Sequence, residues 1–370
     1  MLSIGEIRAL LNQDKGEKNT LSVYLDTDAS IGTWKSKIYS LQKKLDSIQD
    51  SLGTKDKAQF TTERTKLEKF LSTFKPQGKC LAVFSSSPVN LWWAKDVNTP
   101  AAESVTFSRT PKVAPLVEML DEYQRFCAVT IDNESARIFL IKVSEIESVK
   151  HIKDFVPGKH KQTEFNARIE QKHRSMVQDH IKNVVEEIKS LQKKNQFNRL
   201  FLGGTPEARA TFEKLLSPDL KQILCGQFTA SMNQTDDAIK KSAISAANKY
   251  ERAKESQTVE TLETQALKNN GAVIGCDATL LELHNANVFK LVVAGDTTIK
   301  GCKCSACGFA SQTIVKKCSL CGGSTVRTDD LAEEAVQTAV KKGVVRIEVL
   351  KGIERDAFAE AYGMGAFLLR

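Results

Sequence analysis

The residues best suited to chemistry are cysteines that cluster near the C-terminal end of the sequence. Five of the nine cysteines fall within twenty residues, and four of these form two Cys-x-x-Cys pairs separated by ten residues. A glycine follows the second cysteine of each pair. Each pair can hold one edge of a tetrahedral zinc ion, and the glycine lets the chain fold back so that backbone amides approach the thiolates. The sequence therefore predicts one structural zinc ion, bound by Cys304, Cys307, Cys318 and Cys321.

A disulfide framework is the alternative explanation of this cluster. The remaining cysteines stand singly along the chain, at Cys80, Cys127, Cys225 and Cys276, and the first residues do not look like a secretory leader. We therefore expect free thiols in a reducing, cytoplasmic setting. A catalytic zinc is not expected, because four thiolates close the coordination shell and leave no position for water. The fifth clustered cysteine, Cys302, is either a spare ligand or a packing residue.

Composition limits the class of protein. The 370 residues can form two or three domains, and a hydrophobic content of 41% with 26% charged residues is ordinary for a soluble globular protein. No apolar run approaches eighteen residues, so no membrane span is expected. The net charge of +8 permits a nucleic-acid partner without requiring one.

Hydrophobic periodicity predicts an α/β protein of three domains. Residues 1–122 form a mixed-sheet domain that carries a helical hairpin, with the turn near Gly53. Residues 123–266 form a middle domain, and residues 267–370 form an α/β domain interrupted by the cysteine pairs. The outer face of the hairpin is expected to carry lysines that either face solvent or contact RNA: Lys35, Lys37, Lys43 and Lys44.

The middle domain begins with a strand hairpin at 125–131 and 136–143, and a third strand near 149–155 precedes a long amphipathic helix. Alternating strands and helices follow, which is a ribonuclease-H-like order with a mixed sheet. Gly203-Gly204 has no Walker lysine after it, so an ordinary strand-to-helix turn is predicted there instead of a phosphate loop. In the last domain, Asp277 or Thr279 is the expected cap of the first helix.

A basic segment connects the third strand to the long helix. A proline-glycine break is followed by residues that can neutralise RNA phosphates without reading bases. The alternative is a solvated loop that leads into an amphipathic helix. A nuclease would need clustered carboxylates, but Asp132, Glu134 and Asp154 are dispersed in the sequence. The predicted RNA-contacting residues are Lys159, His160, Lys161, Gln162, Arg168, Lys172, His173 and Arg174.

The chain resembles the archaeal and eukaryotic class I release factors and Pelota, and more closely their bacterial relatives, the family that includes the hibernation factor Balon. The resemblance covers roughly residues 123–370, in the domain order and in four local motifs. These motifs are Phe165-Asn-Ala-Arg168 with Lys172-His173-Arg174, Asn198 to Gly204, Gly271 to Gly275, and Cys304 to Gly322.

The chain departs from the release factors at their two working motifs. Release factors hydrolyse peptidyl-tRNA with a Gly-Gly-Gln loop, and the corresponding segment here is Gly158-Lys-His-Lys-Gln162, with no adjacent glycine pair. The side chains of these residues would obstruct the close backbone approach that glycines allow. The first domain also lacks the Asn-Ile-Lys-Ser stop-codon motif.

The resemblance therefore implies a cytoplasmic, non-enzymatic factor that binds the ribosomal A site, as in hibernation. It also implies a translational GTPase partner such as elongation factor Tu. The alternatives are a ribosome-rescue factor, a peptidyl-tRNA hydrolase that uses Gln162, and a non-ribosomal interaction protein that docks through its zinc module.

Overall fold

The computed structural model describes residues 2–13, 18–122, 125–142, 145–156, 166–195 and 197–369. The chain forms two compact units: unit 1 combines Met1–Glu122 with Glu255–Arg370, and unit 2 is Tyr123–Lys254. Both units mix helices and strands, which confirms the predicted α/β class. The boundaries given above for three domains remain a prediction.

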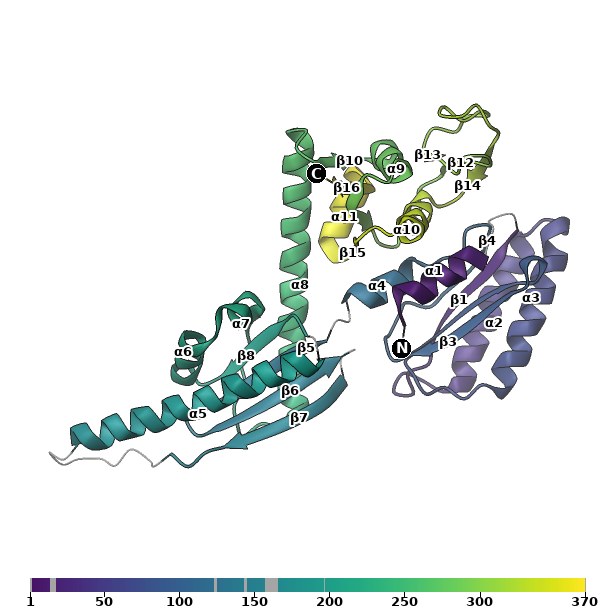
Figure 1. Ribbon diagram of the computed structural model, residues 1–370. Helices are drawn as coiled ribbons and strands as arrows, with labels where there is room; N and C mark the ends of the chain where they lie inside the picture. Colours follow the sequence, from purple (N-terminus) through teal and green to yellow (C-terminus); the bar gives the residue numbers. More distant parts are fainter. Residues whose placement is uncertain are drawn as a thin grey trace. The chain divides into compact units, whose positions relative to one another are not determined.

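A four-stranded antiparallel sheet organises the N-terminal part of unit 1. Its elements are α1 (Ile4–Gln13), β1 (Thr20–Asp26), α2 (Trp34–Ser51), α3 (Thr54–Thr73), β2 (Cys80–Ser86), the 3-10 helix η1 (Ser87–Val89), β3 (Leu91–Val97), β4 (Ser104–Ser108) and α4 (Ala114–Glu122). The strand order is β3-β2-β1-β4. The predicted hairpin α2–α3 covers one face, where Leu41 and Phe60 pack against Val23, and α1 lies on the other face, where Leu10 shares a core with Tyr24 (Figure 1).

The sequence pattern did not predict β4. All five of its residues are half-buried, because the strand pairs only with β1 at the edge of the sheet. Its residues, Ser-Val-Thr-Phe-Ser, do alternate between polar and apolar types, but the pattern lasts for only five positions and sequence reasoning passed over it.

The prediction of a lysine-bearing outer face on the hairpin is wrong for Lys37. This side chain is buried, and its Nζ lies 3.1 Å from Oδ1 of Asp26 and 2.6 Å from the carbonyl oxygen of Asp28. The ion pair fixes the start of α2 to the end of β1. Lys44 also has a carboxylate partner, Glu103, at 2.8 Å.

A second four-stranded sheet organises the C-terminal part of unit 1. Its elements are β10 (Ala272–Ile274), α9 (Cys276–His284), β11 (Val288–Ala294), β12 (Gly301–Cys304), β13 (Ala310–Ser311), β14 (Thr325–Thr328), α10 (Leu331–Lys342), β15 (Arg346–Leu350), α11 (Gly352–Ala361) and β16 (Met364–Leu368). The strand order in this sheet is β10-β16-β11-β15. The segment of chain that connects β11 to α10 forms a separate small sheet with the order β13-β12-β14. This arrangement confirms an α/β fold with the cysteine segment inserted.

The predicted cap of α9 is wrong. Gly275 occupies the cap position with φ of 89°, a left-handed conformation that favours glycine, and no side chain caps the helix. Asp277 instead accepts hydrogen bonds from the Ser311 hydroxyl at 3.0 Å and from the amide of Gln312 at 2.7 Å. These bonds tie the cysteine segment to α9. Thr279 is buried.

The two parts of unit 1 share one apolar core. Ile7 and Leu11 of α1 belong to the same buried cluster as Leu331 and Val336 of α10. The two sheets are far apart in sequence, so this core is built from contacts across more than two hundred residues. Unit 1 therefore folds as one body around α1, α4 and α10.

A buried carboxylate lies at the junction of these two parts. The side chain of Glu333 in α10 accepts hydrogen bonds from the amides of Val113 at 2.7 Å and Ala114 at 3.1 Å. It thereby supplies acceptors for N–H groups at the start of α4, which have no partner within the helix. Gln337, one turn further along α10, donates to the carbonyl oxygen of Pro111 at 2.6 Å. Burial raises the pKa of Glu333 to about 8.

Unit 2 contains a five-stranded mixed sheet. Its elements are β5 (Phe126–Ile131), β6 (Ser135–Lys142), β7 (Glu145–Lys153), α5 (Asn166–Asn195), β8 (Leu200–Gly204), α6 (Pro206–Leu215), α7 (Pro218–Gln222), β9 (Leu224–Gln227) and the N-terminal part of α8 (Asp236–Leu267). The order is β7-β6-β5-β8-β9, with β5, β6 and β7 antiparallel and β8 and β9 parallel to β5. This confirms the ribonuclease-H-like order. Ile181 and Val184 of α5 pack on one face of the sheet, and Ile239 and Ala243 of α8 pack on the other.

Gly204 ends β8 because the backbone of β5 passes close to it. Its φ is +108°, and a β-carbon there would lie 1.8 Å from the carbonyl oxygen of Ile131. At Gly203, a β-carbon would lie 2.7 Å from the ring of Phe228. Close packing therefore accounts for this glycine pair, in agreement with the predicted strand-to-helix turn.

Candidate metal centre and candidate nucleic-acid interface

The four paired cysteines come together at one point beside the small sheet of unit 1. Their sulfur atoms all lie within 4.8 Å of one another. The Sγ atoms of Cys304 and Cys321 are 3.5 Å apart, and those of Cys307 and Cys318 are 3.7 Å apart. Four sulfur atoms bonded to one zinc ion at about 2.3 Å would be about 3.8 Å apart, so the arrangement fits a tetrahedral metal ion.

Backbone amides surround this sulfur cluster. The amide of Cys307 points to Sγ of Cys304 at 3.5 Å, the amide of Leu320 to Sγ of Cys318 at 3.4 Å, and the amide of Gly323 to Sγ of Cys321 at 3.4 Å. Such donors stabilise thiolates. The turns depend on the glycine that follows each pair.

Those two glycines have the conformation that the folded-back turn requires. Gly308 has φ of 76° and Gly322 has φ of 74°. Their amides donate to the carbonyl oxygens of Cys304 at 3.1 Å and Cys318 at 2.9 Å, so the two turns are built alike. The role predicted for these glycines is confirmed.

Backbone amides favour the ionised form of the Cys304 thiol. The amides of Cys307 and Ala306 lower the pKa of Cys304 to about 6. The thiolate is the form that binds metal.

Cys302 takes no part in the group of four. Its buried thiol donates to the carbonyl oxygen of Thr313 at 3.2 Å, and its backbone pairs with Arg327 in the sheet β12–β14. Of the two roles left open by the sequence, packing is the one that this position fits.

The predicted RNA-contacting segment is only partly described. Four of its residues lie outside the described part of the chain: Lys159, His160, Lys161 and Gln162. Arg168 is in the first turns of α5, where only the backbone is described. Lys172 and Arg174 are exposed on α5, and His173 is half-buried. Arg174 lies 3.5 Å from Glu170, an exposed pair that contributes little to stability.

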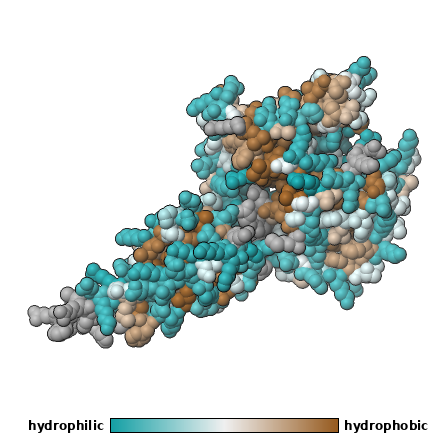
Figure 2. Space-filling model, viewed as in Figure 1, coloured by the Kyte–Doolittle hydropathy of each residue, from teal (hydrophilic) through white to brown (hydrophobic). Residues whose placement is uncertain are grey.

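The start of α5 extends away from the core of unit 2. Residues 170–179 are all exposed or half-buried, and His180 is the first buried residue among those described on the helix. Figure 1 shows these turns reaching past the ends of the strands, and their surface is predominantly hydrophilic in Figure 2. Val177 packs against the core of unit 2, whereas most of the described side chains before it are exposed and available for an external contact.

A buried histidine fixes the base of this extension. Nδ1 of His180 lies 2.7 Å from Oδ2 of Asp154, which immediately follows β7, and Asn183 reaches the same oxygen at 3.4 Å. These contacts hold α5 against the end of β7. Phe155 is next in the chain and is 83% exposed. Sequence reasoning missed this pair, because the two residues are 26 positions apart and neither belongs to a motif.

Two of the three carboxylates considered above for metal-dependent chemistry, Asp132 and Asp154, have structural partners. Asp132 accepts hydrogen bonds from the amides of Glu134 at 3.0 Å and Ser135 at 2.7 Å, which closes the turn between β5 and β6. Asp154 binds His180. In the described ranges, only the four cysteines form a group of three or more possible metal ligands.

Comparison with known proteins finds a family match in the middle of the chain. Residues 111–248 match the family model of the bacterial archaeo-eukaryotic release factor family 10. This segment of the chain is similar to the bacterial branch of the release-factor family. This match covers the ribonuclease-H-like sheet, α5 and the first part of α8, and it confirms the resemblance drawn from the sequence.

Two curated relatives extend the similarity beyond this segment. The chain is 24% identical over 283 residues to peptide chain release factor subunit 1 of Thermococcus onnurineus, which covers 69% of this chain and 68% of that protein. It is 22% identical over 284 residues to the corresponding protein of Thermococcus sibiricus, with the same coverage.

Solved structures of the family are similar over nearly the whole chain, with low scores. Ribosome-bound archaeal Pelota has a TM-score of 0.41 at 12% identity and covers 100% of this chain and 94% of its own. Dom34 of S. cerevisiae, a translation termination-like factor, has a TM-score of 0.42 at 10% identity, with 98% and 92% covered.

No helix in the described ranges combines the length and the apolar character needed to cross a lipid bilayer.

Proposed function

We propose that this release-factor-like protein binds the bacterial ribosome in the A site, without reading codons or hydrolysing peptidyl-tRNA, as a hibernation factor. The observation that carries the proposal is the family match across residues 111–248, which contain the basic, exposed start of α5. In this proposal the segment Lys159–Arg174 contacts ribosomal RNA of the large subunit, and the N-terminal part of unit 1 faces the small subunit.

The absence of hydrolysis is inferred from the sequence before α5. Gly158-Lys-His-Lys-Gln162 places three side-chain-bearing residues between the glycine and the glutamine. Side chains on these residues would keep the backbone from approaching the ester closely, and they exclude the φ/ψ values that only glycine adopts readily. Occupancy of the site, and not chemistry, is therefore the proposed mechanism.

The metal proposed for the cysteine cluster is zinc. Four sulfur ligands in a tetrahedral arrangement with amide donors suit zinc, and four thiolates leave no open position. Cys304, Cys307, Cys318 and Cys321 would hold the ion, whose role would be to stabilise the fold of the small sheet. This would make the metal structural, with no part in a reaction.

The proposed partners follow from the proposed place of action. A translational GTPase such as elongation factor Tu would meet the middle and C-terminal segments, and the protein would work in the cytoplasm. Both proposals depend on family likeness and on ribosome binding.

A-site occupancy can be tested by competition. Purified bacterial ribosomes with a vacant A site should retain the protein in a pelleting assay, and ribosomes whose A site already holds aminoacyl-tRNA should retain much less. Equal retention by the two ribosome preparations would contradict A-site binding.

Peptide release is the second candidate function, and the match to the release-factor family favours it. Ribosomes loaded with a labelled peptidyl-tRNA would be incubated with the protein and with a Gln162→Ala variant. We expect no release above background from either protein. Release that the variant loses would replace the occupancy mechanism with a hydrolytic one.

A further inference from the structure

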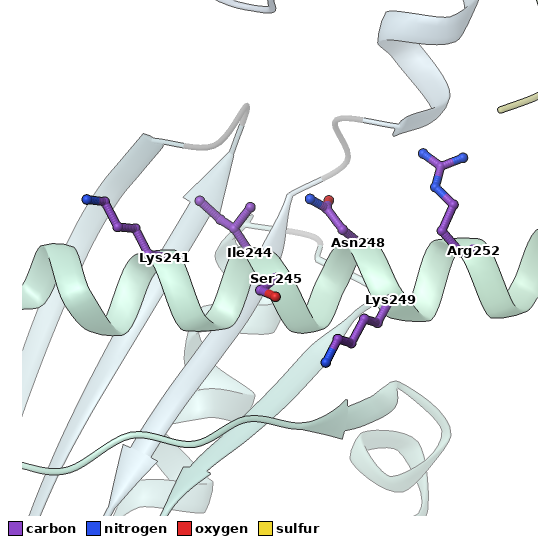
Figure 3. A pocket seen from close by; sticks show the side chains of 6 residues that line it. All are labelled: Lys241, Ile244, Ser245, Asn248, Lys249 and Arg252. Carbon is purple, nitrogen blue, oxygen red and sulfur yellow. The ribbon is translucent and has the colours of Figure 1, made fainter. Parts of the chain in front are cut away.

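A shallow hollow runs along the outward face of α8 in unit 2, and its lining is basic. Figure 3 shows the residues that line it: Lys241, Ile244, Ser245, Asn248, Lys249 and Arg252. Three of the six are cations, two are neutral hydrogen-bonding residues, and none is a carboxylate. From 238 to 250 the helix contains three lysines and no acidic residue.

Helix geometry gathers these side chains into one stripe. Lys241, Ser245, Asn248 and Arg252 are separated by four, three and four positions, so they follow one face of the helix for about 16 Å. Lys249 flanks this stripe and extends to another side of the helix in Figure 3. The opposite face of α8 packs against the sheet through Ile239 and Ala243, and this packing holds the stripe outward.

Cations elsewhere on α8 have carboxylate partners. Lys240 lies 3.3 Å from Asp237, and Lys254 lies 3.9 Å from Glu251. In contrast, Lys241 and Lys249 are exposed, and neither forms an ion pair with any residue that the structure describes. Lys241 and Lys249 therefore present positive charge that the described part of the chain does not neutralise.

We propose that this α8 stripe binds the phosphate backbone of RNA, at a second site separate from the start of α5. Lysine, asparagine and serine side chains donate hydrogen bonds to phosphate oxygens, and such contacts do not depend on base sequence. Only one side chain of the hollow, Ile244, is apolar. A docking surface for a protein would bury a larger apolar centre, so the lining favours a phosphate backbone.

The two basic surfaces of unit 2 belong to helices on opposite faces of its sheet, since α5 and α8 pack against different sides. Unit 2 would then contact RNA on both sides. This inference rests on the proposed ribosome binding, and it adds a contact that the basic segment before α5 does not supply.

The test compares how steeply ribosome binding falls with salt in the wild type and in a K241Q/K249Q variant of the full chain. Each phosphate contact contributes about 0.7–0.9 to the slope of log affinity against log salt. Losing two contacts should lower the slope by about 1.4–1.8. The wild type should then lose about tenfold more affinity than the variant between 50 and 200 mM salt, by the same relation.

A K240Q/K254Q variant is the matched control. It removes the same charge from the same helix at lysines that already have carboxylate partners, and its slope should equal that of the wild type. Circular dichroism would verify that both variants are folded.

The outcomes separate the inference from the proposed function. A reduced slope in K241Q/K249Q alone supports the α8 contact. An unchanged slope, or an equal reduction in both variants, would overturn it while ribosome binding stands. If the wild type did not bind ribosomes at all, the proposed function would fail, and this inference would fail with it.

Discussion

The two units use charged side chains in different ways. Unit 1 buries ionisable side chains against partners: Lys37 forms an ion pair with Asp26, and Glu333 accepts hydrogen bonds from the amides of Val113 and Ala114. Unit 2 also pairs a buried arginine, Arg137, with Asp236 at 2.8 Å. However, the start of its helix α5 and the outer face of α8 leave cations exposed to solvent.

This difference separates structural charges from charges that are free to make contacts. A buried charge that loses its partner destabilises the fold, whereas an exposed cation contributes little to folding and can neutralise a phosphate. Variants in unit 1 should therefore change stability, and variants at the exposed faces of unit 2 should change RNA binding.

The largest effect is expected from Cys318→Ser in unit 1. Structural zinc binding contributes about 10–16 kcal/mol of free energy in small zinc modules, so loss of one ligand should release about one metal ion per chain and unfold the small sheet. Metal content by mass spectrometry and thermal unfolding would measure this.

Cys302→Ser is the matched control, because this cysteine is buried in the same sheet and lies outside the group of four. It should keep the metal. Equal metal content and equal melting in wild type and Cys318→Ser would refute the zinc site.

A smaller effect is expected from the pH dependence of unit 1. Burial raises the pKa of Glu333 to about 8, above its ordinary value of 4.5. Between these values the folded state holds a proton that the unfolded state releases, so the free energy of unfolding should fall as pH rises from about 4.5 to 8. One group can contribute at most about 1.4 kcal/mol per pH unit.

Urea unfolding at pH 5.5 and 7.5 would measure this slope, and tryptophan fluorescence reports unit 1 alone, because the three tryptophans are Trp34, Trp92 and Trp93. Glu333→Gln should flatten the dependence. A remaining slope is expected from Asp330, whose pKa burial also raises. A variant as pH-dependent as the wild type would contradict the assignment to Glu333.

The smallest effect on stability is expected from Lys172→Gln with Arg174→Gln in unit 2. Both side chains are exposed, so melting should change little, but the salt slope of ribosome binding should fall by about 1.4–1.8. Lys193→Gln with Lys194→Gln removes the same charge at the other end of α5 and should leave the slope unchanged. If the two variants changed the slope equally, the start of α5 would not be the contact.

The fold and the cluster of four cysteines were the most predictable features. Cysteine spacing alone predicted which four sulfur atoms come together, because the ligands of each pair are three residues apart and the glycines after them fix the turns. The mixed sheet of unit 2 could also be predicted from local sequence. Its strand hairpin and its long helix each show their own hydrophobic periodicity.

Features built from distant contacts could not be predicted. Lys37 was assigned to a solvated face, because its partner Asp26 is eleven residues away on another element. The common core of unit 1 depends on α10 reaching α1 and α4, and Glu333 meets Val113 across 220 residues. No local pattern encodes such pairs.

The central claim, that the protein binds ribosomes through phosphate contacts, is tested most directly by co-sedimentation with purified bacterial ribosomes over a range of salt. The proposed function predicts that the bound fraction falls steeply from low to high salt, because each phosphate contact releases counterions. Binding that stayed flat across this range, or no binding at low salt, would contradict it.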